Sequence, residues 1–314
     1  MADQCINSNP DIAGIGTRIN FYTTILLTAL TPETATELLD GLYKNSVLYG
    51  LGLVMTAVIQ TFQEQLDLYH AIFVMQIIFC LNLVYEYGQR RFIRSSSRDL
   101  GMKIFIAVQT FSTVLFTVWL LYVWIKDGNF GSQPECNHLV KYVLFFANVR
   151  ATVTWLRVLF IIYLILTACM LLFRFGVILS VYYMEELRTN MKELRTNIQD
   201  KMRKAVTGPE WQEQHRDTEQ LASQPEQPEQ TDAHRPVPAF VTLSVVSAVY
   251  GVATLELIVH RNRPNIQPGE DAWGFGQIIS LILIFGSIVD IVVTVRERYT
   301  KEENPSEEVA MSRL

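Results

Sequence analysis

The sequence predicts an all-α, polytopic membrane protein with about seven transmembrane helices, a lumenal N-terminus and a cytosolic C-terminus. Half of the 314 residues are hydrophobic, and mean hydropathy is positive. The hydrophobic residues form runs of about 20 residues without the alternation of strands. Because lipid offers backbone N–H and C=O groups no hydrogen-bond partner, such runs favour helices, and their pattern is not that of a membrane β-barrel.

Seven hydrophobic segments are expected to cross the membrane. The first begins after the glycine-containing stretch that follows Cys5, and a polar connection, Thr31–Ser46, joins it to the second. Pro32 is typical of a helix start, so we interpret this connection as a loop or an interfacial helix. In chain order, the predicted crossings are Ile15–Leu30, Val47–Phe62, Leu68–Tyr85, Ile104–Ile125, Leu156–Met184, Ala239–Val259 and Trp273–Val295.

The connection Lys126–Leu156 contains a further hydrophobic piece, Leu139–Val149, that Lys141 interrupts and Arg150 ends. This piece is too short to span a bilayer. We interpret it as a re-entrant or interfacial helix that leads into the fifth crossing.

Two segments that are rich in lysine and arginine give the same orientation. Positive charge accumulates in Arg90–Lys103, between the third and fourth crossings, and basic loops tend to be cytosolic. Counting crossings from this loop also places in the cytosol the insert after the fifth crossing, which is rich in lysine and arginine near its start. The N-terminus is then lumenal, and we expect the protein in the endoplasmic reticulum membrane.

Composition divides the chain into four regions. Residues 1–184 hold the first five crossings and the N-terminal cap, residues 185–238 form an amphipathic and then low-complexity cytosolic insert, residues 239–295 hold the last two crossings, and residues 296–314 form a disordered cytosolic tail. The sequence Glu-Leu-Arg-Thr-Asn occurs at 186–190 and again at 193–197. This heptad spacing predicts either a weak helical partner for residues 184–202 or an amphipathic extension of the fifth helix that rests on its own protein or on the membrane.

Cys5 and Cys136 fall on the same, non-cytosolic side in this topology. A disulfide between them is allowed in an oxidising lumen, and two unpaired thiols is the alternative. Cysteine and histidine spacing does not resemble a metal site, so neither a metal nor a cofactor is expected. The net charge of −5 does not favour nucleic-acid binding.

Ionisable residues near the membrane are candidates for function, because inserting one costs roughly 2.5–3.5 kcal/mol. Glu256 lies about one turn inside the outer end of the sixth crossing, and His260, four residues on, shares its helix face. The two could hold or transfer a proton, or could form an interfacial pair that reaches water. Glu64 is a second candidate acid, with a solvated loop as its alternative.

The N-terminal stretch combines Cys5 with Asn9-Pro10-Asp11-Ile12, Gly14, Gly16 and Arg18. It resembles the N-terminus of a group of multi-span fungal membrane proteins that open with C-x-x-NPDI-x-GIG-x-R before a first helix, although here the cysteine is one residue further away. We expect either a lid over a lumenal pocket, with Pro10 and the glycines shaping a tight turn, or a simple helix-start cap. Arg18 would pair with a carboxylate in the first case and would extend to water in the second.

Some proteins of this kind resemble the membrane-bound terpene cyclases of fungal meroterpenoid pathways, such as those of ascofuranone- and macrophorin-type compounds. The resemblance implies a metal-independent isomerase or lyase that protonates a lipophilic prenylated substrate and closes rings through a carbocation. We expect Glu256 or Glu64 as general acid, His260 or Asp11 as positioning residues, and Arg18 to fix the cap. The alternative is a transporter, channel or receptor-like protein without chemistry, since the sequence carries no nucleotide-binding or hydrolase motif.

Overall fold

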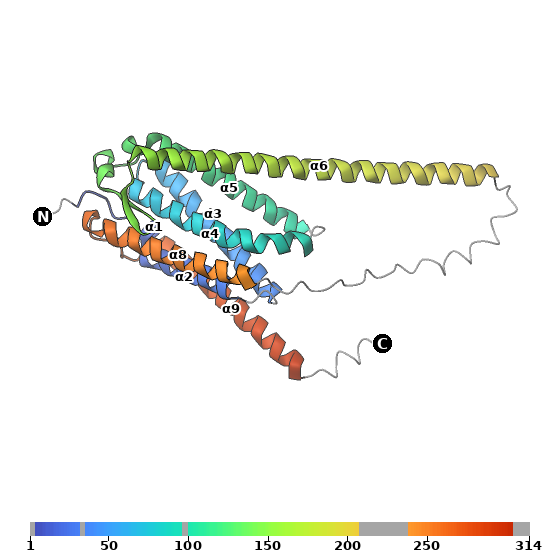
Figure 1. Ribbon diagram of the computed structural model, residues 1–314. Helices are drawn as coiled ribbons and strands as arrows, with labels where there is room; N and C mark the ends of the chain where they lie inside the picture. Colours follow the sequence, from blue (N-terminus) through green and yellow to red (C-terminus); the bar gives the residue numbers. More distant parts are fainter. Residues whose placement is uncertain (1–3, 32–34, 96–99, 207–237, 304–314) are drawn as a thin grey trace. The chain divides into compact units, whose positions relative to one another are not determined.

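The computed structural model describes residues 4–31, 35–95, 100–206 and 238–303 (Figure 1). All seven predicted crossings coincide with helices. In chain order, the α-helices are α1 (Pro10–Ala13), α2 (Ile15–Leu30), α3 (Thr36–Phe62), α4 (Leu68–Ser95), α5 (Leu100–Lys126), α6 (Thr154–Val206), α8 (Pro238–Asn262) and α9 (Phe275–Glu303).

Within the described residues, five helical segments are long and apolar enough to cross a membrane: Leu38–Phe62, Ile104–Lys126, Thr154–Phe173, Thr242–Asn265 and Phe275–Val293. The apolar part of α4, Leu68–Asn82, is shorter, and α2 has only 16 residues. The chain is therefore an all-α integral membrane protein, as the sequence predicts. Many large apolar side chains of α5, α6, α8 and α9 are exposed, as expected of surfaces that face lipid.

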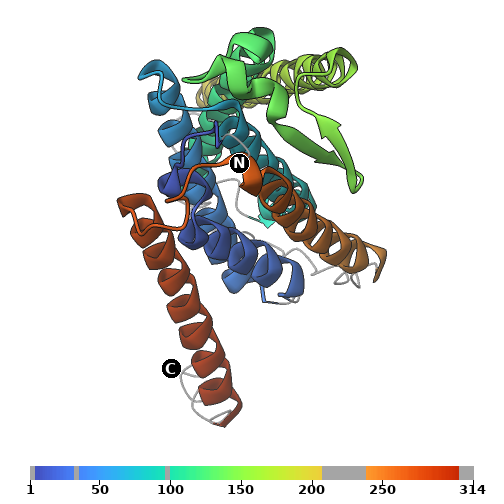
Figure 2. The same cartoon turned by 90° about the vertical axis from the view of Figure 1, so that its left-hand side faces the viewer.

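The chain divides into two compact units, one made of residues 1–166 and 236–314 and the other of residues 167–235. In the larger unit, α4 packs against α8 and α3, and α2 packs against α9 and α8 (Figure 2). Nearly every residue of α4 from Leu68 to Cys80 is buried. The core of this unit therefore surrounds α4, whose apolar stretch is shorter than each of the five segments named above.

The region between α5 and α6 differs from the prediction. The short 3-10 helices η1 (Asp127–Asn129) and η2 (Pro134–Leu139) precede two antiparallel strands, β1 (Lys141–Leu144) and β2 (Ala147–Arg150). The expected interfacial helix over Leu139–Val149 is thus wrong. Phe145 and Phe146 form the turn with φ values of 46° and 68°, and Val143 and Val149 supply β-branched side chains to the strands.

The hairpin gains hydrogen bonds that a helix of this length would lack. Asn262, at the end of α8 and fully buried, accepts a hydrogen bond from the Lys141 N–H (2.8 Å) and donates one to the Lys141 carbonyl (2.8 Å). Figure 2 shows the hairpin beside α8. One amide side chain therefore satisfies the strand edge that faces the helix.

Two further boundaries differ from the prediction, and one agrees with it. The connection Thr31–Ser46 is largely helical, because α3 begins at Thr36 and runs 27 residues without a break. Residues 296–303 belong to α9 rather than to a disordered tail. The predicted continuation of the fifth crossing into the insert is confirmed as far as Val206, whereas residues 207–237 and 304–314 lie outside the described part.

We predict that Asn262→Ala lowers the free energy of unfolding by roughly 2 kcal/mol, because it leaves the backbone groups of Lys141 unpaired at a buried site. The measurement is the thermal midpoint of the detergent-solubilised protein. Asn148→Ala, on the exposed β2 strand, is the matched control and is expected to change little. Equal midpoints for Asn262→Ala and the wild type would contradict this role.

Candidate functional site

The N-terminal cap, defined here as residues 5–14, is tied to two distant segments. A disulfide joins Cys5 to Cys136 in η2, with a Cα–Cα distance of 5.8 Å, which confirms the first of the two predicted alternatives. Ile6 forms a parallel β-bridge with Ile266, through Ile6 N–H to the Asn265 carbonyl (2.9 Å) and Gln267 N–H to the Ile6 carbonyl (2.8 Å). The cap therefore connects the α5–α6 region with the α8–α9 connection.

The rest of the cap binds the start of α9. The Asp11 carboxylate accepts a hydrogen bond from the Gly276 N–H (3.0 Å), so it caps α9 from another part of the chain. Gln277 Oε1 accepts one from the Gly16 N–H (2.9 Å). Asp11, expected to position the general acid, contacts the start of α9.

Gly14 and Gly16 allow this close approach. A Cβ at Gly14 would lie 2.3 Å from the Gln277 Nε2, and one at Gly16 would lie 2.7 Å from the Gln277 Cβ. Gly14 is the residue between α1 and α2, and its φ of −65° is one that any residue adopts, so a left-handed conformation is not what requires glycine there. The glycines bring α2 and α9 together instead.

Arg18 is held between two carboxylates of different segments. Its Nη1 lies 3.2 Å from Glu256 Oε1 in α8, and its Nη2 lies 2.9 Å from Asp271 Oδ1 in the α8–α9 connection. Tyr22, one helical turn after Arg18, donates a very short hydrogen bond to the same oxygen of Glu256. We name these four residues, Arg18, Tyr22, Glu256 and Asp271, the arginine cluster.

The arginine cluster lies at the boundary between the protein and its surroundings. The Arg18 side chain is 14% exposed, whereas Glu256 is 46% exposed although it belongs to a helix that is apolar enough to cross a membrane. A carboxyl group at this position is expensive to place in lipid and is stabilised by its two partners. The expected pairing of Arg18 with a carboxylate is confirmed.

Next to the cap lies a buried histidine. His70 is 1% exposed, and its Nε2 lies 3.0 Å from Glu270 Oε1. The other oxygen of Glu270 accepts a hydrogen bond from the Asn9 N–H (2.8 Å). The His70 Nδ1 and the hydroxyl of the neighbouring Tyr69 are buried and have no hydrogen-bond partner among the protein groups described. Glu270 therefore joins His70 of α4 to Asn9 of the cap.

Asp67, three residues before His70, is a buried carboxyl group in the α3–α4 connection. It is 4% exposed and accepts hydrogen bonds from the Ser132 hydroxyl and from the Asn7 N–H (3.2 Å). Burial raises the pKa of Asp67, while these hydrogen bonds and the nearby His70 oppose the change. Its position outside the apolar helices leaves it at the polar end of the bundle.

Two predicted site residues lie apart from these groups. Glu64 is exposed, has a φ of 56° and sits in the turn that follows α3, as the solvated-loop alternative predicts. His260 is exposed and makes no hydrogen bond with Glu256, whose Oε1 is bound to Arg18 and Tyr22 on α2. The expected Glu256–His260 pair is therefore not formed.

Sequence reasoning missed several partners in the site. Tyr22 could have been found, because it stands four residues after Arg18 on the same helix. Asp271 and Glu270 come from an irregular connection without periodicity, so spacing gives no signal for their contacts. The choice between Glu64 and Asp67 needed the fold, since only the structure shows which carboxylate is covered.

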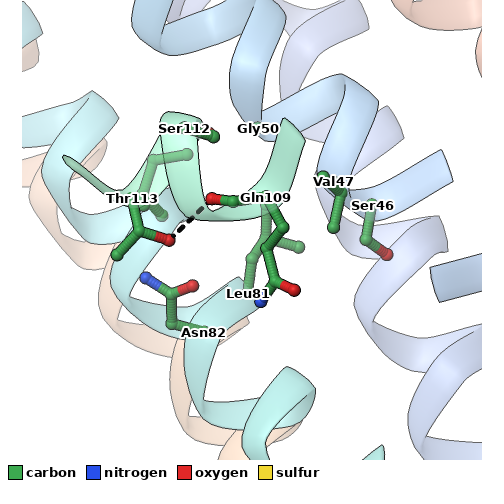
Figure 3. Close-up of a pocket in the computed structure, with 9 residues that line it drawn as sticks. Ser46, Val47, Gly50, Leu81, Asn82, Gln109, Ser112 and Thr113 are labelled. Atoms are coloured by element: carbon green, nitrogen blue, oxygen red, sulfur yellow. Dashed lines mark hydrogen bonds between the residues drawn. The ribbon is translucent and has the colours of Figure 1, made fainter. Parts of the chain in front are cut away.

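A small cavity lies elsewhere, between α3, α4 and α5 (Figure 3). Its volume is about 40 Å³, enough for about one water molecule. Thr113 beside it donates a hydrogen bond to the Gln109 carbonyl (3.0 Å). This cavity is too small for a prenyl chain, and none of the arginine cluster lines it.

Comparisons with protein-family models, with curated proteins and with solved structures found no match. Within the described ranges, three or more histidine, cysteine or acidic side chains do not gather in a way that could hold a metal ion. The fold and the site define an all-α integral membrane protein with a disulfide-linked N-terminal cap and a cluster of acidic, basic and phenolic side chains.

We predict that Arg18→Gln lowers the free energy of unfolding by roughly 2 kcal/mol, because two carboxylates lose their shared cation. Adding Glu256→Gln to Arg18→Gln should restore part of this loss, since the uncompensated charge is then removed. Thermal midpoints measure both. Arg263→Gln is the control, because Arg263 is 78% exposed and lies 3.9 Å from Asp271. An equal effect of the two arginine substitutions would contradict the assignment.

The raised pKa of Asp67 predicts a pH-dependent stability. In the unfolded chain the carboxyl ionises near pH 4, whereas in the folded protein it holds its proton to higher pH. Folding therefore binds a proton in this interval, and the contribution of Asp67 to stability falls as pH rises through it. Relative to Asp67→Asn, the wild type should lose thermal stability between the unfolded pKa and the raised folded pKa. A difference that is constant or grows in favour of the wild type with pH would contradict this.

Proposed function

We propose that this protein is a membrane-bound terpene cyclase of secondary metabolism, of the kind found in fungal meroterpenoid pathways. It would protonate a lipophilic prenylated substrate, such as a farnesylated compound or its epoxide, and close rings through a carbocation. The alternative in which the protein is a transporter, channel or receptor-like protein without chemistry is decided by the experiment below.

The position of Glu256 in the arginine cluster carries the proposal. Arg18 Nη1 lies 3.2 Å from Glu256 Oε1, and Tyr22 donates a hydrogen bond to the same oxygen. These two contacts orient an acidic side chain on a helix that is apolar enough to cross a membrane. An acidic group held in this way can act on a substrate that reaches it in a fixed geometry.

Access to the substrate supports the same residue. A farnesyl chain dissolves in the bilayer, and Glu256 is half exposed on an apolar helix. The substrate can therefore approach the carboxyl group from lipid. Tyr22 and Arg18 hold the carboxyl in a fixed orientation, and Tyr22 places a phenol ring beside the developing cation.

The proposed reaction needs no cofactor. Glu256 transfers its proton to the epoxide oxygen or to the terminal olefin, and the resulting cation is attacked by the π electrons of the next double bond. Loss of a proton from the cyclised cation ends the reaction and restores the acid. The net change is an isomerisation, so atoms and electrons balance without an oxidant or reductant.

We propose that this site lies on the lumenal side. The disulfide between Cys5 and Cys136 is stable in an oxidising compartment such as the endoplasmic reticulum lumen, and basic residues 90–103 favour the cytosol. With α2 and α4 included, seven helices cross the membrane and the C-terminus is cytosolic. The exposed apolar surfaces of the candidate spans support this arrangement.

We predict that Glu256→Gln reduces cyclisation by roughly 10²–10⁴-fold, the usual contribution of a general acid. The measurement is product analysis, by mass spectrometry, of microsomes fed a farnesylated phenol or its terminal epoxide, in which a cyclised isomer has the substrate mass and a new retention time. Glu64→Gln is the matched control and should retain activity, because Glu64 lies in an exposed turn.

Two results would contradict the proposal at different levels. If the wild type gives no cyclised product while Cys5 and Cys136 are protected from thiol reagents until reduction, the protein is folded and the cyclase proposal fails. If Glu256→Gln cyclises at the wild-type rate, the reaction stands and the assignment of the acid fails.

A further inference from the structure

The extension of α6 carries an apolar seam that faces solvent. Residues 167–206 of α6 belong to the smaller compact unit, and α6 is one uninterrupted helix of 53 residues (Figure 1). Large apolar side chains recur along the extension at alternating spacings of three and four residues, and each is between 47% and 66% exposed. These residues, which we name the seam, are Met184, Leu187, Met191, Leu194 and Ile198.

The sequence around the seam is polar. The predicted crossing Leu156–Met184 ends where the seam begins, and the residues that follow include Arg188, Lys192 and Arg195. An exposed apolar seam among charged side chains is costly unless a partner covers it.

The heptad assignment favours a two-stranded coiled coil. Met184, Met191 and Ile198 take the a positions, and Leu187 and Leu194 take the d positions, where leucine favours parallel dimers. The e position holds Arg188 and Arg195, and the g position holds Asn190 and Asn197. A partner helix would therefore contact arginine side chains along one edge of the seam and asparagine side chains along the other.

We propose that the seam joins two copies of this chain in a parallel, in-register coiled coil. In that arrangement Asn190 of one copy faces Arg195 of the other, and no like charges oppose each other. An antiparallel pairing would place Arg188 beside Arg195. When two copies lie in one membrane, their α6 helices leave it on the same side and run in the same direction, which allows the parallel pairing.

Anchoring in the membrane strengthens the pairing of this short seam. About two heptads bind weakly in solution, but anchoring by the membrane spans raises the local concentration of the second copy and makes the pairing effective. The dimer does not depend on the proposed reaction, since the seam and the arginine cluster belong to different units.

The test is oxidative cross-linking of the full-length protein in microsomes, with two differently tagged copies in a Cys169→Ser background. The native cysteines that remain are Cys80, which is buried, and the Cys5–Cys136 disulfide. Leu194→Cys should give a covalent dimer that contains both tags. Thr196→Cys, two residues on at the opposite face of the helix, is the matched control and should not.

Two further variants fix the arrangement. Leu187→Ser added to Leu194→Cys should abolish the cross-linked dimer, while continued protection of Cys5 and Cys136 from thiol reagents shows that the protein is still folded. The proposal is overturned by a folded Leu194→Cys protein without cross-links, by equal cross-linking at 196, or by capture of a different protein. It is also overturned if Leu187→Cys in one copy cross-links to Ile198→Cys in the other, since that pairing requires antiparallel helices.

Discussion

The shared contact of Arg18 with Glu256 and Asp271 is the interaction on which the arrangement of the site depends. It joins α2 to α8 and to the connection that leads into α9, so three segments far apart in the chain meet at one guanidinium. A planar guanidinium can offer separate donors to two carboxylates, which a lysine ammonium on a flexible stem does less well. The orientation of the Glu256 side chain follows from this contact and from the hydrogen bond of Tyr22.

The cap makes that contact possible by fixing where α2 begins. Its backbone pairs with Asn265 and Gln267, its disulfide reaches Cys136, and Asp11 caps α9. A disulfide that closes a loop of this length mainly restricts the unfolded chain. The cap thus stabilises the polar ends of the helices, where lipid does not enforce the helical structure. It also orders polar side chains such as Glu270.

Hydrophobic runs predicted the helices of this protein well, because the cost of unpaired backbone groups in lipid leaves little choice of structure. Arg18 could be assigned a carboxylate partner for the same reason, since a cation near the membrane needs one. The hairpin of β1 and β2 was missed because its stability comes from Asn262, 121 residues away from Lys141, which no local pattern reveals. The close packing of α9 against Gly14 and Gly16 was not predicted, because no local pattern shows that Gln277 approaches them.

The same limit explains why the sequence could not choose among the carboxylates. Glu64 and Asp67 are three residues apart in one polar connection, yet one is exposed and the other is covered by Ser132 and Asn7 from distant segments. Burial, and not residue type or spacing, separates their chemistry, because desolvation acts on the carboxyl group that other segments cover. Glu256 differs from both: it lies on an apolar helix, faces its surroundings and is bound to a cation that a second carboxylate also neutralises. That combination places an oriented acidic side chain where a lipophilic substrate can approach it, which is the physical basis for proposing this residue as the acid.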